Sequence, residues 1–240
     1  MSSNKPSSSE VHPGPGFRVC NTYPQCNPAS IEAIRQFDVP DISDALNRLY
    51  ALDTGIKCMN ATPRAISGNV CTVRVFPGDN LMVHKALDIA RAGDIIAIDG
   101  NGERSTNAIL GDLICTKAQH LGIGGFIVDG LVRDMPGINE IGFPVFARGT
   151  TAVGPLHRGP GEINFPISCG GVVVNPGDVM VADEAGIVVI PLPHLDLILA
   201  RLAANRSRME QYLAAVRKGE FSNAWVDQLL QDSGCPEDNA

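Results

Sequence analysis

The stretch GDLICTKAQHLGIGGFIVDGLVRD, residues 111–134, contains the pattern that decides the fold. Its first half has helical periodicity and ends in glycines, and an apolar run (126–128) typical of a buried strand follows at once. The run passes into Asp129 and then into Arg133 and Asp134. A core strand that ends in charged side chains indicates a binding site at its carboxyl end, because ligands of open α/β sheets gather there.

The segments on either side extend this pattern of strands and helices. DIIAIDG (94–100) predicts a strand before the helix, with a polar loop over 101–110, and FPVFARG (143–149) predicts a strand after it. Upstream, AISGNVCTVRVF (65–76) is strand-like, and downstream the run 167–191 predicts a meander of short strands separated by NPGD and DEAG. We therefore expect an α/β fold in which a central mixed sheet is flanked by helices.

The same patterns predict how the chain is organised. We expect a single domain over residues 30–225 with no internal linker. The Ser-, Pro- and Gly-rich residues 1–29 predict a flexible N-terminal tail, and residues 226–240 a C-terminal tail. Helical periodicity predicts four further helices, over residues 30–37, 40–50, 81–93 and 193–220.

The composition argues against several classes of protein. A net charge of −7 over 240 residues disfavours general nucleic-acid binding. No apolar run reaches the roughly 20 residues of a membrane-spanning helix, and the N-terminal residues lack the apolar core of a secretion signal. Seven cysteines, never spaced as CxxC, indicate neither a disulfide framework nor a zinc site. We therefore expect a cytoplasmic protein without nucleic-acid or membrane partners.

Two strand ends of the predicted sheet could form one site. If strands 94–99 and 126–129 are parallel neighbours joined by the helix, the N-terminus of that helix and the charged pair after the second strand lie on the same rim. Free backbone amides at the helix start can hold an anion, and a glycine there permits close approach of a ligand. The candidate substrate-binding residues are Gly111, Asp112, Leu113, Ile114 and Arg133.

The charged side chains of this set suggest a chemistry. Arg133 offers a planar fork of donors that suits a carboxylate or an enolate. Asp134, with Asp112 nearby, suits one Mg²⁺ or Mn²⁺ and its waters. Together they fit a small 2-oxo acid whose enolate the cation and the arginine would stabilise. The alternatives are a surface ion pair for Arg133 and Asp134, and a favourable acid at a helix N-terminus for Asp112.

The spacing GDL-x19-RD, with its second half inside GGFIVDGLVRD, resembles the class II pyruvate aldolase family. That family contains the 4-hydroxy-4-methyl-2-oxoglutarate and 4-carboxy-4-hydroxy-2-oxoadipate aldolases. The resemblance covers about residues 40–220. It extends to DISDAL (41–46), PGDN (77–80), RAGDIIAID (91–99) and NPGDVMVADEAGIVVIP (175–191).

The resemblance implies an activity and roles for the site residues. The family cleaves a 4-hydroxy-2-oxo acid to pyruvate and a second oxo acid, and the same enolate would form if oxaloacetate lost CO₂. It implies that Asp134 ligates Mg²⁺ or Mn²⁺ and that Arg133 holds the keto or enolate oxygen. The amides of Asp112, Leu113 and Ile114 would hold the substrate carboxylate. A water held by Asp112 could take the hydroxyl proton.

The resemblance also implies a fold and an assembly. The family's fold is similar to the swivelling β/β/α domain, and its members form trimers or hexamers with the active site between subunits. An acidic residue from the C-terminal region of a neighbouring subunit assists the waters on the metal, and by position Glu210 is the candidate.

Two alternatives to a metal aldolase stay open at this point. The same fold includes a non-catalytic regulator that binds a ribonuclease, but its motif lacks the acid that this chain keeps at Asp134. A Schiff-base aldolase would need a desolvated lysine, and no lysine falls within a predicted core strand. The segment 148–171 does not indicate the substrate, although His157 and Arg158 could face it.

Overall fold

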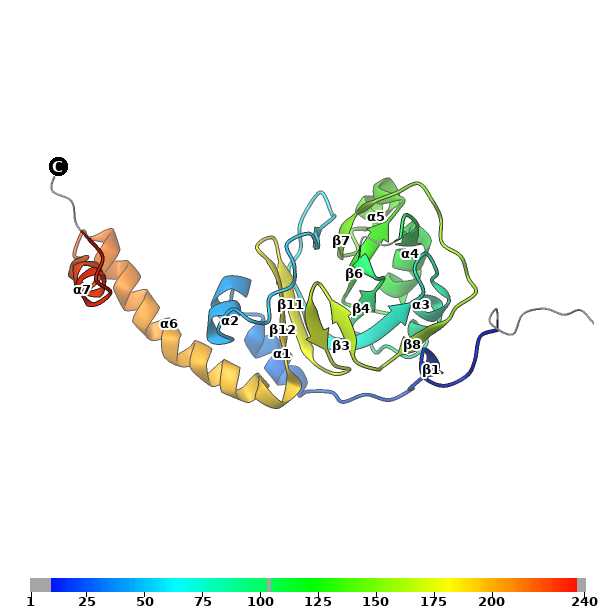
Figure 1. Cartoon of the computed structure of the whole chain (residues 1–240), viewed down its shortest axis with the longest axis horizontal. Coiled ribbons are helices and arrows are strands. Elements are labelled where there is room, and N and C mark those ends of the chain that lie inside the picture. Colours follow the sequence, from blue (N-terminus) through cyan, green and yellow to red (C-terminus); the bar gives the residue numbers. More distant parts are fainter. Residues whose placement is uncertain (1–9, 103–104, 237–240) are drawn as a thin grey trace, which may run out of the picture. The chain divides into compact units, whose positions relative to one another are not determined.

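A mixed sheet of ten strands forms the centre of the fold (Figure 1), in a computed structural model that describes residues 10–102 and 105–236. Parallel and antiparallel pairs both occur in it, which confirms the expected α/β fold with a central mixed sheet. In spatial order the main path runs β1 (Phe17–Val19), β8 (Gly161–Ile163), β3 (Ile66–Val75), β4 (Ile95–Asp99), β6 (Gly125–Val132), β7 (Val145–Thr150) and β2 (Lys57–Cys58).

The middle of the sheet is parallel, which meets the condition on which the expected site at one rim depends. β4 pairs with β6 in a register that sets Ile96 beside Phe126 and Asp99 beside Asp129. The run from Ile95 through Ile98 has no exposed surface, so both faces of β4 are covered. A continuous apolar run is what a parallel strand buried on both faces requires.

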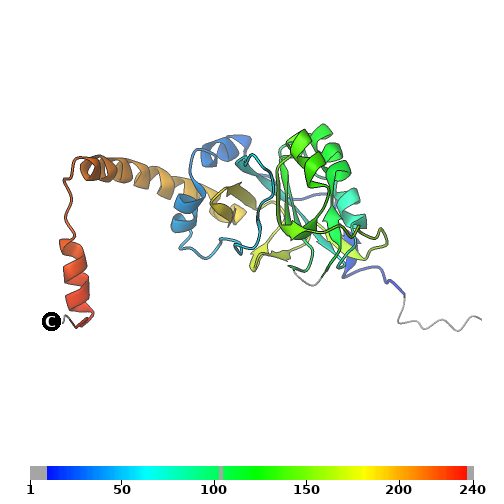
Figure 2. The same ribbon diagram turned by 90° about the horizontal axis from the view of Figure 1, so that it is seen from above.

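Helices α3 (Leu81–Ala86), α4 (Asp112–His120) and α5 (Met135–Ile141) cover one face of this sheet. Val83, Cys115 and Ile138 project from them into one apolar cluster with strand residues such as Ile96 and Val128. Figure 2 shows the green helices of residues 112–141 grouped beside the strands. The helices therefore pack on one face of each strand. The charged residues at the strand ends occupy the alternate positions, which point to the opposite face.

The opposite face is covered by β-structure. Residues such as Met180 and Val189 form a second apolar cluster with Ile95 and Ile127 on that face. The meander predicted over 167–191 is thus confirmed as two antiparallel pairs, and the layers follow the order helix, sheet, β-structure. The pairs are β9 (Ile167–Cys169) with β10 (Val172–Val174), and β11 (Val179–Asp183) with β12 (Gly186–Ile190).

The remaining helices lie before and after the central elements in the chain. The chain divides into two compact units after Leu199, and the longest helix, as predicted, belongs to the C-terminal region. No helix in the described part of the chain is both long and apolar enough to span a bilayer. These helices are α1 (Pro28–Ile34), α2 (Val39–Ala45), the short 3₁₀ helix η3 (Leu192–His194), α6 (Leu195–Arg217) and α7 (Ala224–Asp232).

Three predicted loop or tail segments contain elements that the sequence did not indicate. The loop predicted over 101–110 contains β5 (Ala108–Leu110), which pairs with β6 because its three apolar residues are buried there. The tail predicted over 1–29 contains β1 and a buried Tyr23, whose hydroxyl donates to Asp94; residues 1–9 lie outside the described residues. The tail predicted over 226–240 contains most of α7, an amphipathic helix.

Candidate functional site

The ends of two neighbouring strands meet where α4 begins. β5 and β6 are parallel, and the amide of Arg133 donates to the carbonyl of Leu110 at 3.0 Å. Gly111 follows immediately as the N-cap residue of α4. The predicted rim, on which a helix start and a charged strand end lie together, is therefore present.

Gly111 is in direct contact with the charged pair. A Cβ at this position would clash with the carboxylate of Asp134 and would lie 3.1 Å from Cγ of Arg133. The backbone of Gly111 is extended, with φ −146°, so it is the space and not the backbone conformation that demands glycine. The sequence motifs around 111 and 133 thus meet within van der Waals distance.

Arg133 and Asp134 form an ion pair that stays accessible. Nε of Arg133 lies 3.1 Å from Oδ2 of Asp134, and the two side chains are 43% and 41% exposed. Asp134 adopts the left-handed conformation, with φ 58° and ψ 39°, at the N-cap of α5. Most residues other than glycine lose about 1 kcal/mol in this conformation, and Asp is one of the few that tolerate it. The turn therefore holds this carboxylate beside Gly111.

The pair opens into a cavity of about 440 Å³. Five of the predicted site residues line this cavity. The structure therefore brings together two motifs that are twenty residues apart in the sequence. Its lining includes Asn80, His84, Leu110, Gly111, Leu113, Ile114, Arg133, Asp134, Gly154, Pro155 and His157.

The start of α4 lies at this cavity, where the sequence predicts an anion cradle. Gly111 has no side chain that could cap the helix, so the first amides of α4 have neither an intrahelical partner nor a capping side chain. Asp112 is absent from the cavity lining: its carboxylate faces Gly137 of α5, where a Cβ would clash with it. The backbone of Asp112 remains at the cradle while its side chain faces the neighbouring helix.

Glu210 lies elsewhere in the chain. It is an exposed residue of α6, in the part of that helix that belongs to the second unit. Its predicted role in a neighbouring subunit stays a prediction.

The cavity also contains polar residues outside the predicted site, although His157 was noted as one that could face the substrate. The rings of His84 and His157 lie edge to face with centroids 5.7 Å apart. Burial lowers the pKa of His84, and the nearby charge of Lys117 and the ring of His157 lower it further. Nδ1 of His157 lies 2.6 Å from Oδ1 of Asn80, a residue that is 2% exposed.

The motif PGDN (77–80), which is part of the family resemblance, is the sequence feature that could have pointed to these residues. Asp79 and Asn80 are both 2% exposed, although polar side chains in a turn are usually solvated. Asp79 accepts from the amide of Arg158 at 2.6 Å, and the amide of Leu156 donates to the carbonyl of Gly78 at 2.7 Å. The turn therefore fixes the loop that carries His157.

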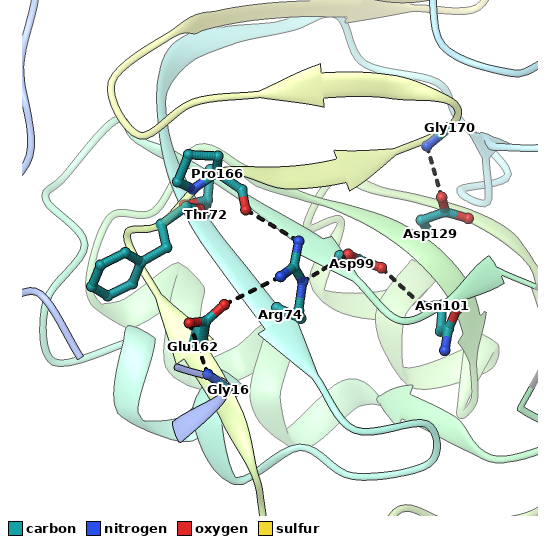
Figure 3. Close-up of polar contacts among 10 residues, drawn as sticks. Gly16, Thr72, Arg74, Asp99, Asn101, Asp129, Glu162, Pro166 and Gly170 are labelled. Carbon is teal, nitrogen blue, oxygen red and sulfur yellow. Dashed lines mark hydrogen bonds and ion pairs between the residues drawn. The ribbon is translucent and has the colours of Figure 1, made fainter. Parts of the chain in front are cut away.

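A second set of charged residues lies on the other face of the sheet (Figure 3). Glu162 accepts from Arg18 at 2.6 Å and from Arg74 at 3.2 Å, and Arg74 also donates to Asp99 at 3.2 Å. These side chains come from positions that are matched in register across neighbouring strands. We call the set the charge row; its members are Arg18, Glu162, Arg74, Asp99, Asp129 and Arg148.

Asp129 belongs to this row and not to the cavity. Its Oδ1 accepts from Nε of Arg148 at 2.5 Å and its Oδ2 from the amide of Gly170 at 2.7 Å. Gly170 lies in the turn between β9 and β10, and the carbonyl of Pro166, just before β9, accepts from Arg74 at 3.2 Å. The row therefore attaches the β9–β10 hairpin to the sheet (Figure 3).

A hard divalent cation fits the residues beside Gly111. The carboxylate of Asp134 is accessible and lies in a space that a Cβ on Gly111 would fill. Mg²⁺ is usually held by one or two carboxylates, with waters and substrate oxygens completing its six ligands. Within residues 10–102 and 105–236, no three His, Cys, Asp or Glu side chains gather into a metal-holding group. A cation here would therefore depend on water and substrate for most of its ligands.

Comparison with known proteins gives a consistent family. The RraA-like family described as Aldolase/RraA matches residues 39–189. A protein of Halalkalibacterium halodurans that carries the name 4-hydroxy-4-methyl-2-oxoglutarate aldolase in provisional form is 39% identical over 85% of this chain and 99% of its own length. The 4-hydroxy-4-methyl-2-oxoglutarate aldolase of Thermus thermophilus is 35% identical over 64% of this chain and 92% of its own length.

Solved structures of similar proteins carry a different name. The RNA-processing inhibitor RraA of Thermus thermophilus is 32% identical, with a TM-score of 0.59 over 65% of this chain and 93% of that one. Streptomyces coelicolor RraAS2, described as an unusual member of the RNase ES inhibitor RraA family, has a TM-score of 0.71 over 80% of this chain and 99% of that one. At 23% identity the latter supports the fold alone.

Proposed function

Because the chain belongs to the Aldolase/RraA family, we propose that it is a divalent-metal-dependent aldolase that cleaves a 4-hydroxy-2-oxo acid of the 4-hydroxy-4-methyl-2-oxoglutarate type. The products would be pyruvate and a second oxo acid. One observation carries the proposal: the uncapped start of α4, Arg133 and Asp134 line a single cavity, with Gly111 packed between them. That set of groups matches the parts of a 2-oxo acid.

Each part of the substrate has a matching group in the cavity. The amides at the start of α4 would bind the carboxylate, because a helix N-terminus favours an anion. The guanidinium of Arg133 would donate to the keto oxygen and would stabilise the negative charge that develops there when the bond between C3 and C4 breaks. Asp134 would hold Mg²⁺ or Mn²⁺, which when bound supplies positive charge against the same oxygen.

The same groups would support decarboxylation of oxaloacetate. Loss of CO₂ from that acid leaves the enolate that aldol cleavage leaves, so Arg133 would stabilise it in the same way. We therefore expect oxaloacetate decarboxylation as a side activity. We also expect a homotrimer or hexamer, in which an acidic residue such as Glu210 of a neighbouring subunit completes the site.

Pyruvate release from 4-hydroxy-4-methyl-2-oxoglutarate tests the proposal. Activity should require Mg²⁺ or Mn²⁺, fall to background in EDTA, and return when the metal is restored. Asp134→Asn is the sharpest variant, because Asn tolerates the left-handed backbone of this position while it removes the anionic ligand. We expect Asp134→Asn to lose at least about 100-fold in kcat/KM and to bind Mn²⁺ more weakly by calorimetry. Turnover that survives both EDTA and Asp134→Asn would overturn the metal role.

A second candidate function is that of a ribonuclease regulator. The likeness to structures described as RNA-processing inhibitors favours it. Inhibition of a purified ribonuclease by this chain, together with no turnover on a panel of 2-oxo acids with and without metal, would establish the regulator in place of the aldolase. The accessible Asp134 makes the aldolase the better supported of the two, since a carboxylate that lines a cavity beside Arg133 suits a small ligand and a cation.

A further inference from the structure

The side-chain orientation of Asn80 is fixed by its surroundings. Asn80 is 2% exposed, and its Nδ2 donates to the carbonyl of Ile109 at 2.9 Å. A flipped amide would set Oδ1 against that carbonyl, where two acceptors would face each other. Oδ1 of Asn80 therefore faces Nδ1 of His157, at 2.6 Å.

This orientation determines the tautomer of His157. An amide oxygen only accepts, so Nδ1 of His157 carries the hydrogen and donates it to Asn80. In the neutral ring, Nε2 then holds a lone pair. Such a nitrogen can accept a hydrogen bond from a hydroxyl group, whereas it cannot donate to a carboxylate.

The loop holds this ring at the cavity that contains Arg133. His157 is an exposed residue that lines the cavity, and its loop is fixed by the bonds of Asp79 and Gly78 to the amides of Arg158 and Leu156. The loop also approaches the charged pair: a Cβ on Gly154 would lie 2.6 Å from Nη1 of Arg133. Among residues 10–102 and 105–236, Nδ1 of this ring has a hydrogen-bond partner and none is recorded for Nε2. The fixed ring thus shares the cavity with the groups that would bind the 2-oxo acid.

The charged and titratable groups around His157 come from four elements. His84 of α3 contacts its ring, Lys117 of α4 lies near enough to His84 to affect it, and Arg133 and Asp134 follow β6. Asp79 is engaged by amides of Leu81 and Arg158, at 2.8 and 2.6 Å. In the described residues, the partner of Nδ1 is thus the neutral Asn80, and no carboxylate takes that place.

We propose that His157 is the proton acceptor of the cleavage step and the group that recognises the substrate hydroxyl; this rests on the proposed aldolase function. His157 takes the place of the water held by Asp112, because the carboxylate of Asp112 faces α5 and does not line the cavity. The C4 hydroxyl gives its proton to Nε2, its oxygen becomes the carbonyl of the departing oxo acid, and the electron pair of the C3–C4 bond passes into the enolate. The enolate carbon then takes a proton from water, and His157 returns its own proton to solvent. No oxidant or further reactant is required.

Comparison of two reactions of one enzyme tests this role. Cleavage of a 4-hydroxy-2-oxo acid requires removal of a hydroxyl proton, whereas decarboxylation of oxaloacetate yields the same enolate without one. We expect His157→Gln to lower kcat for cleavage by about 100-fold or more and to leave kcat for decarboxylation within about threefold. His194→Gln, which changes an exposed histidine outside the cavity, is the matched control and should leave both rates unchanged.

The outcomes separate this inference from the proposed function. A wild-type chain that turns over no 2-oxo acid with metal would sink the aldolase, and this role with it. An active wild type in which His157→Gln lowers both reactions equally, or neither, would overturn the role of His157 alone. Nitrogen NMR of the histidine rings gives a readout independent of turnover: His157 should show a protonated Nδ1 and a bare Nε2, and the opposite tautomer would also overturn the inference.

Discussion

The cavity and the charge row use the same residue types in opposite ways. In the row, Glu162 and Asp129 are 4% and 7% exposed, and each accepts from an arginine and from a backbone amide. In the cavity, Arg133 and Asp134 face each other at 3.1 Å and remain about two-fifths exposed. The row satisfies its charges internally, while the cavity leaves hydrogen-bonding capacity for a ligand.

This difference separates stability from function at the ends of neighbouring strands. A buried carboxylate with two partners stabilises the fold only while both partners remain. An accessible pair contributes little to stability, so changes in the cavity should alter activity and changes in the row should alter the free energy of unfolding. Four predictions test that separation.

The largest effect is expected from Gly111→Ala. The added methyl group would clash with Asp134 and press on Arg133, so kcat/KM for cleavage should fall by about 100-fold or more. The extended backbone accepts alanine without strain. Gly149→Ala is the control, because its Cβ would make an ordinary contact of 3.5 Å with Leu131. Similar kinetics for the two variants would show that Gly111 does not border the reacting groups.

Arg133→Lys should retain the charge but lose the planar fork. We expect kcat/KM to fall by about 10- to 100-fold, because lysine cannot make two parallel hydrogen bonds to the substrate. The midpoint of thermal unfolding should change little, since the pair in the wild type is accessible. A variant with normal kcat/KM and a lowered midpoint would instead assign Arg133 to the scaffold.

Asp129→Asn should show the reverse behaviour. Loss of the buried carboxylate leaves Arg148 without its main partner, and about 3 kcal/mol of unfolding free energy should be lost in denaturant titrations. Activity per folded molecule should be unchanged. Asp53→Asn removes the exposed partner of the same arginine and should be nearly silent. Equal losses from both variants would contradict the importance of burial.

The smallest effect is a pH dependence in the row. Burial alone would raise the pKa of Glu162, but the amide of Gly16 and the charges of Arg18 and Arg74 outweigh it and lower the pKa. A lowered folded-state pKa means that this stabilisation is present at neutral pH and is lost as the pH falls through that pKa. The stability difference between wild type and Glu162→Gln, measured from pH 7 to pH 3, should therefore shrink below about pH 4. A stability difference that does not vary with pH would indicate that it arises from packing and not from the charge of Glu162.

Much of the fold could be predicted because the residues within many of its elements are enough to indicate their secondary structure. The buried runs at 95–98 and 126–128 have the composition of parallel core strands, and their glycine-bounded connecting helix follows from periodicity. β5 and β8 have three residues each, too few to show a period, and they form strands because neighbouring strands pair with them. The register that aligns the charge row across β8, β3 and β4 depends on such pairings.

The same limit applied to the site. Gly111, Arg133 and Asp134 could be predicted to converge, because one helix and two strands set their positions. His157 lies 77 residues from Asn80 in sequence, and only the folded path of a long loop brings them together. The sequence likewise did not reveal that the carboxylate of Asp112 faces α5 and not the cavity.

The left-handed backbone of Asp134 limits which amino acids can replace it. Among amino acids, Gly, Asn and Asp adopt that conformation at low cost, while most others add strain to the start of α5. A lineage that abandons metal chemistry but keeps this turn would therefore drift first to Asn or Gly. Under the proposed metal role, the identity of this one residue is a sequence marker that sorts relatives of this fold into those able to hold a cation and those that are not.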